Sequence, residues 1–199
     1  MLENVSFILK KGDTVCIRGL NGAGKSTFYK LLTGLYRPVT GCVKLDGESL
    51  TEVRRESLNK LILYISQDEK CLNGSIKNYL REISGSEISD ATIEEWQERL
   101  HFNREDETIT GNGDSLSGGQ RKKLFLMKLL ARADSSAVII ADELAAGMDV
   151  ETVPIMQELL SGYAKKRDKI IFVTDHQNYG NVECNVVMTF NGGKIEIER

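Results

Sequence analysis

The sequence lacks a long hydrophobic run and an excess of positive charge. Its longest clean apolar run, Ala137 to Ala141 (AVIIA), falls far short of the roughly 20 residues that a membrane-spanning helix needs. The 26 lysines and arginines are outnumbered by 29 aspartates and glutamates, which gives a net charge of -3. Partners such as nucleic acids and anionic lipids usually select a basic surface. We therefore expect a chain that does not itself cross a bilayer and that binds no nucleic acid.

Closely spaced cysteine pairs are also missing. The four cysteines, Cys16, Cys42, Cys71 and Cys184, lie far apart in the sequence and form no C-x-x-C pair. The N-terminus does not resemble a secretory signal peptide. These absences predict reduced cysteines and a cytosolic compartment.

The composition that remains is typical of one soluble domain. The chain has 199 residues, of which 41% are hydrophobic and 28% are charged, so it can bury one real core and has room for a subdomain. Alternation over Thr14–Gly19 predicts a strand, and the continuous apolar run over Leu61–Gln67 predicts a strand buried in a parallel sheet. Over residues 73–130 the apolar residues recur at helical spacing, which predicts a small helical subdomain. In it, Ser75 is expected to cap the helix IKNYLREI.

A glycine-rich loop gives the strongest functional signal. Residues 19–26 (GLNGAGKS) match the P-loop pattern G-x-x-x-x-G-K-[ST], follow a predicted strand and open a predicted helix. In such a loop the backbone N–H groups surround phosphate oxygens, Lys25 reaches the outer phosphates, and Ser26 is placed to bind Mg²⁺. The alternative is a glycine-rich turn without a ligand, which the strand before it and the helix after it disfavour.

Two further segments carry candidate chemistry. Asp142 and Glu143 end the strand AVIIA, where an open α/β sheet places ligand-binding side chains, so one carboxylate is predicted to bind Mg²⁺ and the other to prepare the attacking water. An acidic helix cap is the alternative. The segment SLSGGQRKKLFLMKLL begins a second helix with an anion-binding start, which we expect to serve a nucleotide held by another subunit. Here the alternative is an ordinary capped helix.

Taken in order, four segments resemble the motifs of ATP-binding cassette (ABC) ATPases. GLNGAGKST resembles the Walker A motif, LSGGQR the signature, VIIADE the Walker B motif, and the later DH the switch histidine. Together they cover nearly the whole chain. Within the family, ISQDEKCLNGSIKNYL is similar to the exporter form of the Q-loop segment, and ITGNGDSLSGGQ to the loop before the signature in exporters.

The resemblance implies an α/β fold, namely a P-loop NTPase (RecA-like) core with an inserted small α-helical subdomain. It divides the chain into residues 1–68 as the first part of the core, residues 69–124 as the helical subdomain ending in the signature, and residues 125–199 as the second part of the core.

It also implies the residues of the site. Those that bind ATP are Asn21, Gly22, Ala23, Gly24, Lys25, Ser26 and Thr27. Those that close the site from a second subunit are Ser117, Gly118, Gly119 and Gln120, with Asp149 at the dimer seam. The implied metal ligands are Ser26, Gln67 and Asp142. The implied catalytic residues are Glu143 as base, Gln67 at the metal and the water, and His176 at the γ-phosphate.

The implied function is that of the ATP-binding and ATP-hydrolysing domain of an ABC transporter of exporter type, with ATP and Mg²⁺ as cofactors. Its partners would be a second ABC ATPase domain, identical or not, packed head to tail around two ATP, and transmembrane domains that contact the segment after Gln67. That arrangement predicts a location at the cytoplasmic face of a membrane. The alternatives are an importer-type ABC ATPase subunit and a soluble ABC ATPase without a transport role. The exporter-like segment after Gln67 favours the first interpretation.

Some positions depart from the family pattern. Asp175 stands before His176, Ala146 and Gly147 replace the usual serine of the D-loop, and Tyr79 replaces a common asparagine. The upstream strand that bears the family's adenine-stacking aromatic is not in this sequence. We therefore expect either that the chain is a piece of a longer polypeptide or that this aromatic is supplied from elsewhere.

Overall fold

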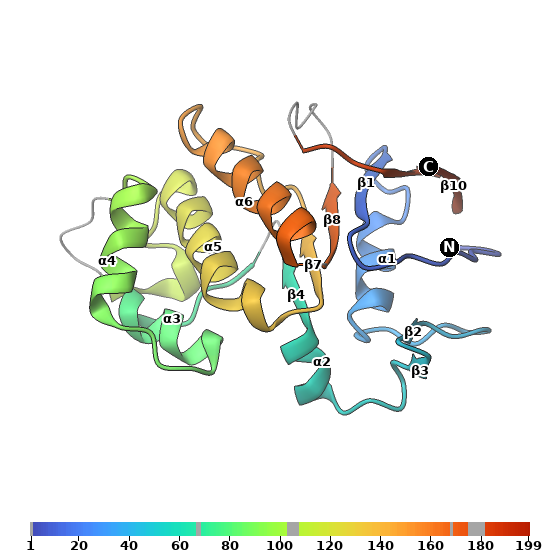
Figure 1. Ribbon diagram of the computed structural model, residues 1–199, viewed down its shortest axis with the longest axis horizontal. Helices are drawn as coiled ribbons and strands as arrows, with labels where there is room; N and C mark the ends of the chain where they lie inside the picture. Colours follow the sequence, from blue (N-terminus) through green and yellow to red (C-terminus); the bar gives the residue numbers. More distant parts are fainter. Residues whose placement is uncertain (1, 67–68, 103–107, 168, 175–181) are drawn as a thin grey trace.

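The computed structural model describes residues 2–66, 69–102, 108–167, 169–174 and 182–199, and Figure 1 shows its elements. The first elements are β1 (Thr14–Gly19), α1 (Lys25–Leu32), β2 (Lys44–Leu45), β3 (Glu48–Ser49), α2 (Arg55–Leu61) and β4 (Ile62–Ile65). The middle elements are β5 (Gly74–Ser75), α3 (Ile76–Ser84), α4 (Asp90–Arg99), β6 (Thr108–Ile109), η1 (Gly111–Gly113) and α5 (Gly118–Arg132). The last are η2 (Ala133–Ser135), β7 (Val138–Ala141), α6 (Thr152–Arg167), β8 (Ile170–Thr174), β9 (Val186–Asn191) and β10 (Lys194–Glu198).

A six-stranded sheet forms the centre of the molecule. Its strand order is β10-β9-β1-β8-β7-β4, and all neighbours are parallel except the antiparallel pair β9 and β10. The predicted α/β fold with a parallel sheet is therefore confirmed. Because parallel strands all end at one edge, the residues that follow β1 and β7 and the last residue of β8, Thr174, meet there.

Both faces of the sheet are covered by helices. In β1, Val15 and Ile17 pack with Phe28 of α1, whereas Cys16 belongs to the core on the opposite face. Figure 1 shows α1 on one side of the sheet and α5 and α6 on the other. Alternate residues of β7 divide in the same way between the two cores. This double burial explains why β7 is a continuous apolar run rather than an alternating one.

The middle of the chain is helical, as predicted. Ser75 caps α3, because its side chain accepts a hydrogen bond from the backbone N–H of Asn78 at 3.1 Å. In Figure 1, α3 and α4 lie on the far side of α5 from the sheet. The boundary drawn after residue 124 falls inside α5, so this one helix extends from the signature turn into the second part of the predicted core.

Within the described ranges, no helix combines the length and the apolar character that crossing a membrane requires.

The prediction of reduced cysteines is wrong for one pair. Cys16 and Cys184 form a disulfide, with their Cα atoms 5.7 Å apart. They are 168 positions apart in sequence, but β9 runs beside β1 and Cys184 lies just before β9, so the fold brings them together. Cys42 and Cys71 are free, the first exposed and the second buried. Burial raises the pKa of the Cys71 thiol to about 11, so this cysteine is a protonated core residue at neutral pH.

The disulfide should contribute measurably to stability. Closing so long a loop restricts the unfolded chain, so we expect reduction to lower the free energy of unfolding by about 2 to 5 kcal/mol. Urea unfolding of the parent with and without reductant measures the effect. Cys184→Ala should match the reduced parent under both conditions, and Cys42→Ala should keep the parent's sensitivity to reductant. An oxidised parent that unfolds at the same urea concentration as the reduced one would contradict this.

Candidate functional site

The P-loop lies between β1 and α1 with the backbone that its motif requires. Gly22 has φ +81° and Gly24 has φ +107°, conformations that other residues adopt only with strain. A Cβ atom at Gly22 would meet no atom within 4 Å, so the loop faces open space there. A Cβ at Gly19 would lie 2.7 Å from the carbonyl oxygen of Phe190, so β9 packs too closely for any side chain. The glycines therefore serve both the loop and the sheet.

Lys25 is the buried cation of the site. Its side chain is 7% exposed, and its Nζ donates to the carbonyl oxygens of Gly19 at 2.7 Å and Leu20 at 3.3 Å. Burial lowers the pKa of Lys25, while the carboxylates of Glu143 and Asp142 raise it. The structure thus brings the lysine of the P-loop and the predicted acid pair close enough for their charges to interact.

Asp142 follows β7 and is held by two hydroxyl groups. Its Oδ1 accepts from Thr174 Oγ1 at 2.7 Å, and its Oδ2 accepts from Tyr64 OH at 3.2 Å. Its backbone N–H donates to the carbonyl oxygen of Ile65 at 3.0 Å. Burial raises the pKa of the Asp142 carboxyl, and the two hydroxyl groups oppose this rise by bonding the ionised form. Its carboxylate is therefore fixed at both oxygen atoms.

Glu143 is half-buried and has a left-handed backbone, with φ +51°. Such a conformation is strained for a residue with a side chain and is concentrated at functional sites. The carbonyl oxygen of Glu143 accepts from Ala146 N at 3.1 Å and from Lys122 Nζ at 3.1 Å. These contacts fix the backbone that carries the predicted base.

The signature turn forms the N-terminus of α5. Ser117 Oγ accepts from Gln120 N at 3.2 Å, and Gln120 Oε1 accepts from Ser117 N at 2.9 Å, which makes a capping box. These two side chains therefore also serve the ordinary capping role. Gly118 is exposed, and a Cβ there would meet no atom within 4 Å. Across the described residues, no hydrogen bond or ion pair joins this turn to the P-loop of the same chain.

Asp149 caps another helix. Its Oδ1 accepts from the backbone N–H of Thr152 at 2.8 Å and from Thr152 Oγ1 at 2.6 Å, and its Oδ2 lies 3.3 Å from Lys123 Nζ. The hydrogen bonds from Thr152 and the charge of Lys123 lower the pKa of Asp149. Asp149 therefore links the start of α6 to α5 within the chain.

Two predicted catalytic residues, Gln67 and His176, lie outside the described residues. Just after Gln67, the Glu69 carboxylate forms an ion pair with Lys128 of α5. Tyr79, the residue at the usual asparagine position, is buried, and its hydroxyl has no hydrogen-bond partner among the described residues. Through the Glu69–Lys128 ion pair, the segment after Gln67 is connected to α5.

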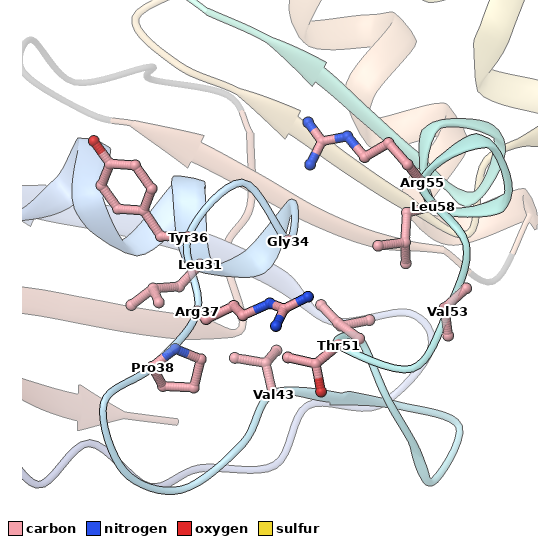
Figure 2. Close-up of a pocket in the computed structure, with 11 residues that line it drawn as sticks. Leu31, Gly34, Tyr36, Arg37, Pro38, Val43, Thr51, Val53, Arg55 and Leu58 are labelled. Atoms are coloured by element: carbon pink, nitrogen blue, oxygen red, sulfur yellow. The ribbon is translucent and has the colours of Figure 1, made fainter.

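A cavity of about 220 Å³ lies apart from the phosphate loop. Its lining residues lie between positions 31 and 58, at the end of α1, in α2 and in the connecting segments. Figure 2 shows Arg37 reaching into this cavity and Val43 and Thr51 beside it. Because its lining contains neither the P-loop nor the acid pair, the cavity is separate from the predicted nucleotide site.

Several residues of this site were not predicted from the sequence. Tyr29, Tyr64 and Thr174 hold Asp142 directly or through one another, and Lys122 binds the carbonyl of Glu143. The three hydroxyl residues belong to no motif used above, and Lys122 lies in the segment SLSGGQRKKLFLMKLL but was given no role. The available signal was the presence of polar hydroxyl groups in or next to strongly apolar segments.

The residues present fit a magnesium nucleotide. The P-loop offers an open backbone surface and a buried lysine for phosphate, and Ser26 and Asp142 offer the oxygen ligands that Mg²⁺ prefers. Over the described ranges, no group of three or more His, Cys, Asp or Glu side chains could hold a metal by itself. A site with few protein ligands is typical of Mg²⁺ that arrives with phosphates.

Comparison with known proteins identifies the family. The profile described as ABC transporter matches residues 2–146. The chain belongs to the ABC transporter family. It is an ATP-binding domain of that family, its P-loop NTPase fold is the predicted one, and its enzymatic class is ATP hydrolysis.

Curated relatives of this ABC domain are transporters of exporter type. An ATP-dependent lipid A-core flippase of Photobacterium profundum is 32% identical over 206 residues, covering 100% of this chain and 34% of the relative. The beta-(1→2)glucan export ATP-binding/permease protein NdvA of Rhizobium etli is 29% identical over 201 residues, covering 98% and 34%. The ABC multidrug transporter atrC of Emericella nidulans is 26% identical over 217 residues, covering 98% and 17%. The chain therefore spans about a third or less of these relatives.

Lys25 should be required for nucleotide binding. Lys25→Ala removes the cation of the phosphate loop, and a hydrogen bond to a charged group is worth about 1.5 to 3 kcal/mol, so the Kd for ATP should rise about 10- to 100-fold. Isothermal titration calorimetry measures this. The control is Lys30→Ala, which removes one charge from the last turn of the same helix. Equal ATP affinities of parent and Lys25→Ala would refute the assignment of the phosphate site.

Proposed function

We propose that this chain is the ATPase domain of an exporter, and that it binds Mg²⁺-ATP and drives transport through partner membrane domains. The observation that carries the proposal is the juxtaposition of the P-loop lysine with the acid pair that follows β7. The sequence relatives support the exporter class, because their names describe a flippase, a glucan export protein and a multidrug transporter. The importer-type subunit and the soluble ABC ATPase remain the alternative functions.

The nucleotide site is proposed to use the residues of the P-loop, namely Asn21, Gly22, Ala23, Gly24, Lys25, Ser26 and Thr27. Their backbone amides and the start of α1 favour negative phosphate oxygens. Ser26 and Asp142 would hold Mg²⁺, together with Gln67. The bound cation would neutralise charge on the phosphates. The predicted division into residues 1–68, 69–124 and 125–199 stays part of this proposal.

Glu143 is proposed as the general base. A general base must stand beside the reacting phosphate, and Glu143 adjoins Asp142 in the group around Lys25. Gln67 and His176 keep the proposed roles at the water and at the γ-phosphate. The strained backbone of Glu143 supports a functional role, since strain of this kind persists where the surroundings enforce it.

Removal of this base should separate binding from hydrolysis. Glu143→Gln keeps the shape of the side chain and removes the carboxylate, so we expect ATP hydrolysis to fall about 100-fold or more while the Kd for ATP changes little. Steady-state phosphate release and calorimetry measure the two quantities. Glu158→Gln, on the exposed face of α6, makes the same chemical change as a control. Hydrolysis within about threefold of the parent would exclude Glu143 as the base.

A second ABC ATPase domain is proposed to close the site. The turn formed by Ser117, Gly118, Gly119 and Gln120 presents the start of a long helix, and the first N–H groups of a helix have no partners within it. Because no hydrogen bond or ion pair joins this turn to its own P-loop among the described residues, its proposed nucleotide is one held by the other subunit. Asp149 would lie at the seam between the two.

The two-subunit site can be tested at Gly118. An arginine there meets no atom of its own chain near the Cβ position and leaves the Ser117 cap in place, so it should obstruct only a partner. In the Glu143→Gln background, ATP should produce dimers, and Gly118→Arg should abolish them, as measured by light scattering. A mixture of Glu143→Gln chains with and without Gly118→Arg should form mixed dimers in which one nucleotide site is closed. Gly162→Arg, at another open helical glycine in α6, is the control. Unchanged dimerisation of the Gly118→Arg chain would contradict the arrangement.

Transmembrane domains are the proposed partners that the ATPase cycle drives. The segment after Gln67 is the proposed contact, and the Glu69–Lys128 ion pair supports this by linking that segment to α5, the helix that begins with the signature turn. Such a partnership would keep the chain at the cytoplasmic face of a membrane.

A further inference from the structure

Three hydroxyl groups and one carboxylate form a continuous, largely buried hydrogen-bond network at the edge of the sheet. Tyr29 OH lies 2.6 Å from Thr174 Oγ1, which donates to Asp142 Oδ1 at 2.7 Å. Tyr64 OH donates to the other carboxylate oxygen, Oδ2, at 3.2 Å. Tyr29 and Thr174 are 0% exposed and Asp142 is 8% exposed. Tyr64 is half-buried, but Tyr29, Thr174 and Asp142 lie away from solvent, where hydrogen bonds fix side-chain orientation most strongly.

The direction of these hydrogen bonds follows from the number of protons. An ionised carboxylate only accepts, so Thr174 donates its single hydroxyl hydrogen to Asp142. Thr174 then has only lone pairs to offer Tyr29, and the Tyr29 hydroxyl is the donor. The order is Tyr29 to Thr174 to Asp142. Each donor polarises the next, and the ionised form of the buried aspartate is the one stabilised.

The elements that supply these groups are those that build the phosphate site. Tyr29 stands one helical turn after Lys25 on α1, so the helix that begins at the P-loop also carries the first donor. Thr174 ends β8, and Tyr64 lies in β4, on the other side of β7. The Asp142 carboxylate is thus held on one side by Thr174 of β8, which Tyr29 of α1 supports, and on the other side by Tyr64 of β4.

We propose that Tyr29, acting through Thr174, and Tyr64 are positioning residues that hold the Asp142 carboxylate in the orientation in which it binds the divalent cation of the nucleotide. This inference rests on the proposed nucleotide site. Each carboxylate oxygen has about two acceptor positions, so one hydrogen bond at each leaves capacity for a cation. Groups that orient a metal ligand typically change metal affinity 10- to 100-fold when they are removed. Neither tyrosine belongs to the phosphate loop or to the acid pair.

The test uses Mn²⁺ and ADP with the 199-residue chain. Free Mn²⁺ is measured by electron paramagnetic resonance in the presence of saturating ADP, and ADP binding without metal is measured by calorimetry. Tyr29→Phe, Tyr64→Phe and Thr174→Val should each raise the Kd for Mn²⁺ about 10-fold or more. ADP affinity without metal should stay within about threefold. Thr174→Ser keeps the hydroxyl and should restore Mn²⁺ affinity.

Tyr79→Phe is the matched control. It removes a buried tyrosine hydroxyl that has no hydrogen-bond partner among the described residues, so its Mn²⁺ affinity should equal that of the parent. A second readout needs no ligand: the thermal unfolding of Tyr29→Phe, Thr174→Val and the double variant. The losses of stability caused by Tyr29→Phe and Thr174→Val should be strongly non-additive, because the double variant removes both ends of one hydrogen bond.

The outcomes separate this inference from the proposed function. Unchanged Mn²⁺ affinity in Tyr29→Phe and Tyr64→Phe, with a parent that binds both Mn²⁺ and ADP, would overturn the positioning role alone. Equal losses of ADP affinity with and without metal would also overturn it, since they would report general damage to the site. A parent chain that fails to bind ADP or Mn²⁺ would overturn the proposed function and the inference together.

Discussion

The parallel alignment of β1, β7, β8 and β4 is the constraint on which the site depends. Parallel neighbours end at the same edge, so the glycine loop after β1, the acid pair after β7 and the hydroxyl that ends β8 meet there although they are far apart in sequence. The close contact of Gly19 with Phe190 belongs to the same constraint, because it lets β9 pack beside β1 where the loop begins. Both faces of the sheet are covered by helices, so the charged groups at the edge are partly removed from water.

Burial of these charges sets the chemistry of the site. A buried lysine and a buried aspartate each lose hydration, and the pKa directions of Lys25 and Asp142 show that desolvation is the largest effect on both. Each is compensated by specific partners: Lys25 by loop carbonyls and the acid pair, and Asp142 by two hydroxyl groups. An uncompensated charge of either sign would be costly there. Lys25 and the acid pair are therefore mutually dependent parts of one arrangement.

Local patterns predicted the parts of the structure that local interactions determine. The P-loop, the cap at Ser75 and the strand over Thr14–Gly19 are all specified by residues within a few positions of one another. The hydrogen bonds around Asp142 join residues separated by 32, 78 and, through Thr174, 145 positions, and the disulfide joins residues 168 positions apart. No periodicity encodes such pairs. They depend on strand order, which a single sequence does not display, and a tyrosine in an apolar helix is indistinguishable from an ordinary core aromatic.

The left-handed backbone of Glu143 illustrates how distant elements support a site that its own sequence disfavours. Aspartate and asparagine adopt this conformation more readily than glutamate, so a stable φ of +51° needs external support. One contact is local, from Ala146, but the other comes from Lys122, within the second turn of α5. The adjacent lysine, Lys123, pairs with Asp149, which caps α6. Two consecutive lysines after the signature turn therefore hold both ends of the segment from Glu143 to Asp149. A shift of α5 relative to the sheet would have to break or carry these contacts, so the geometry of Glu143 depends on the position of the helix that begins with the signature.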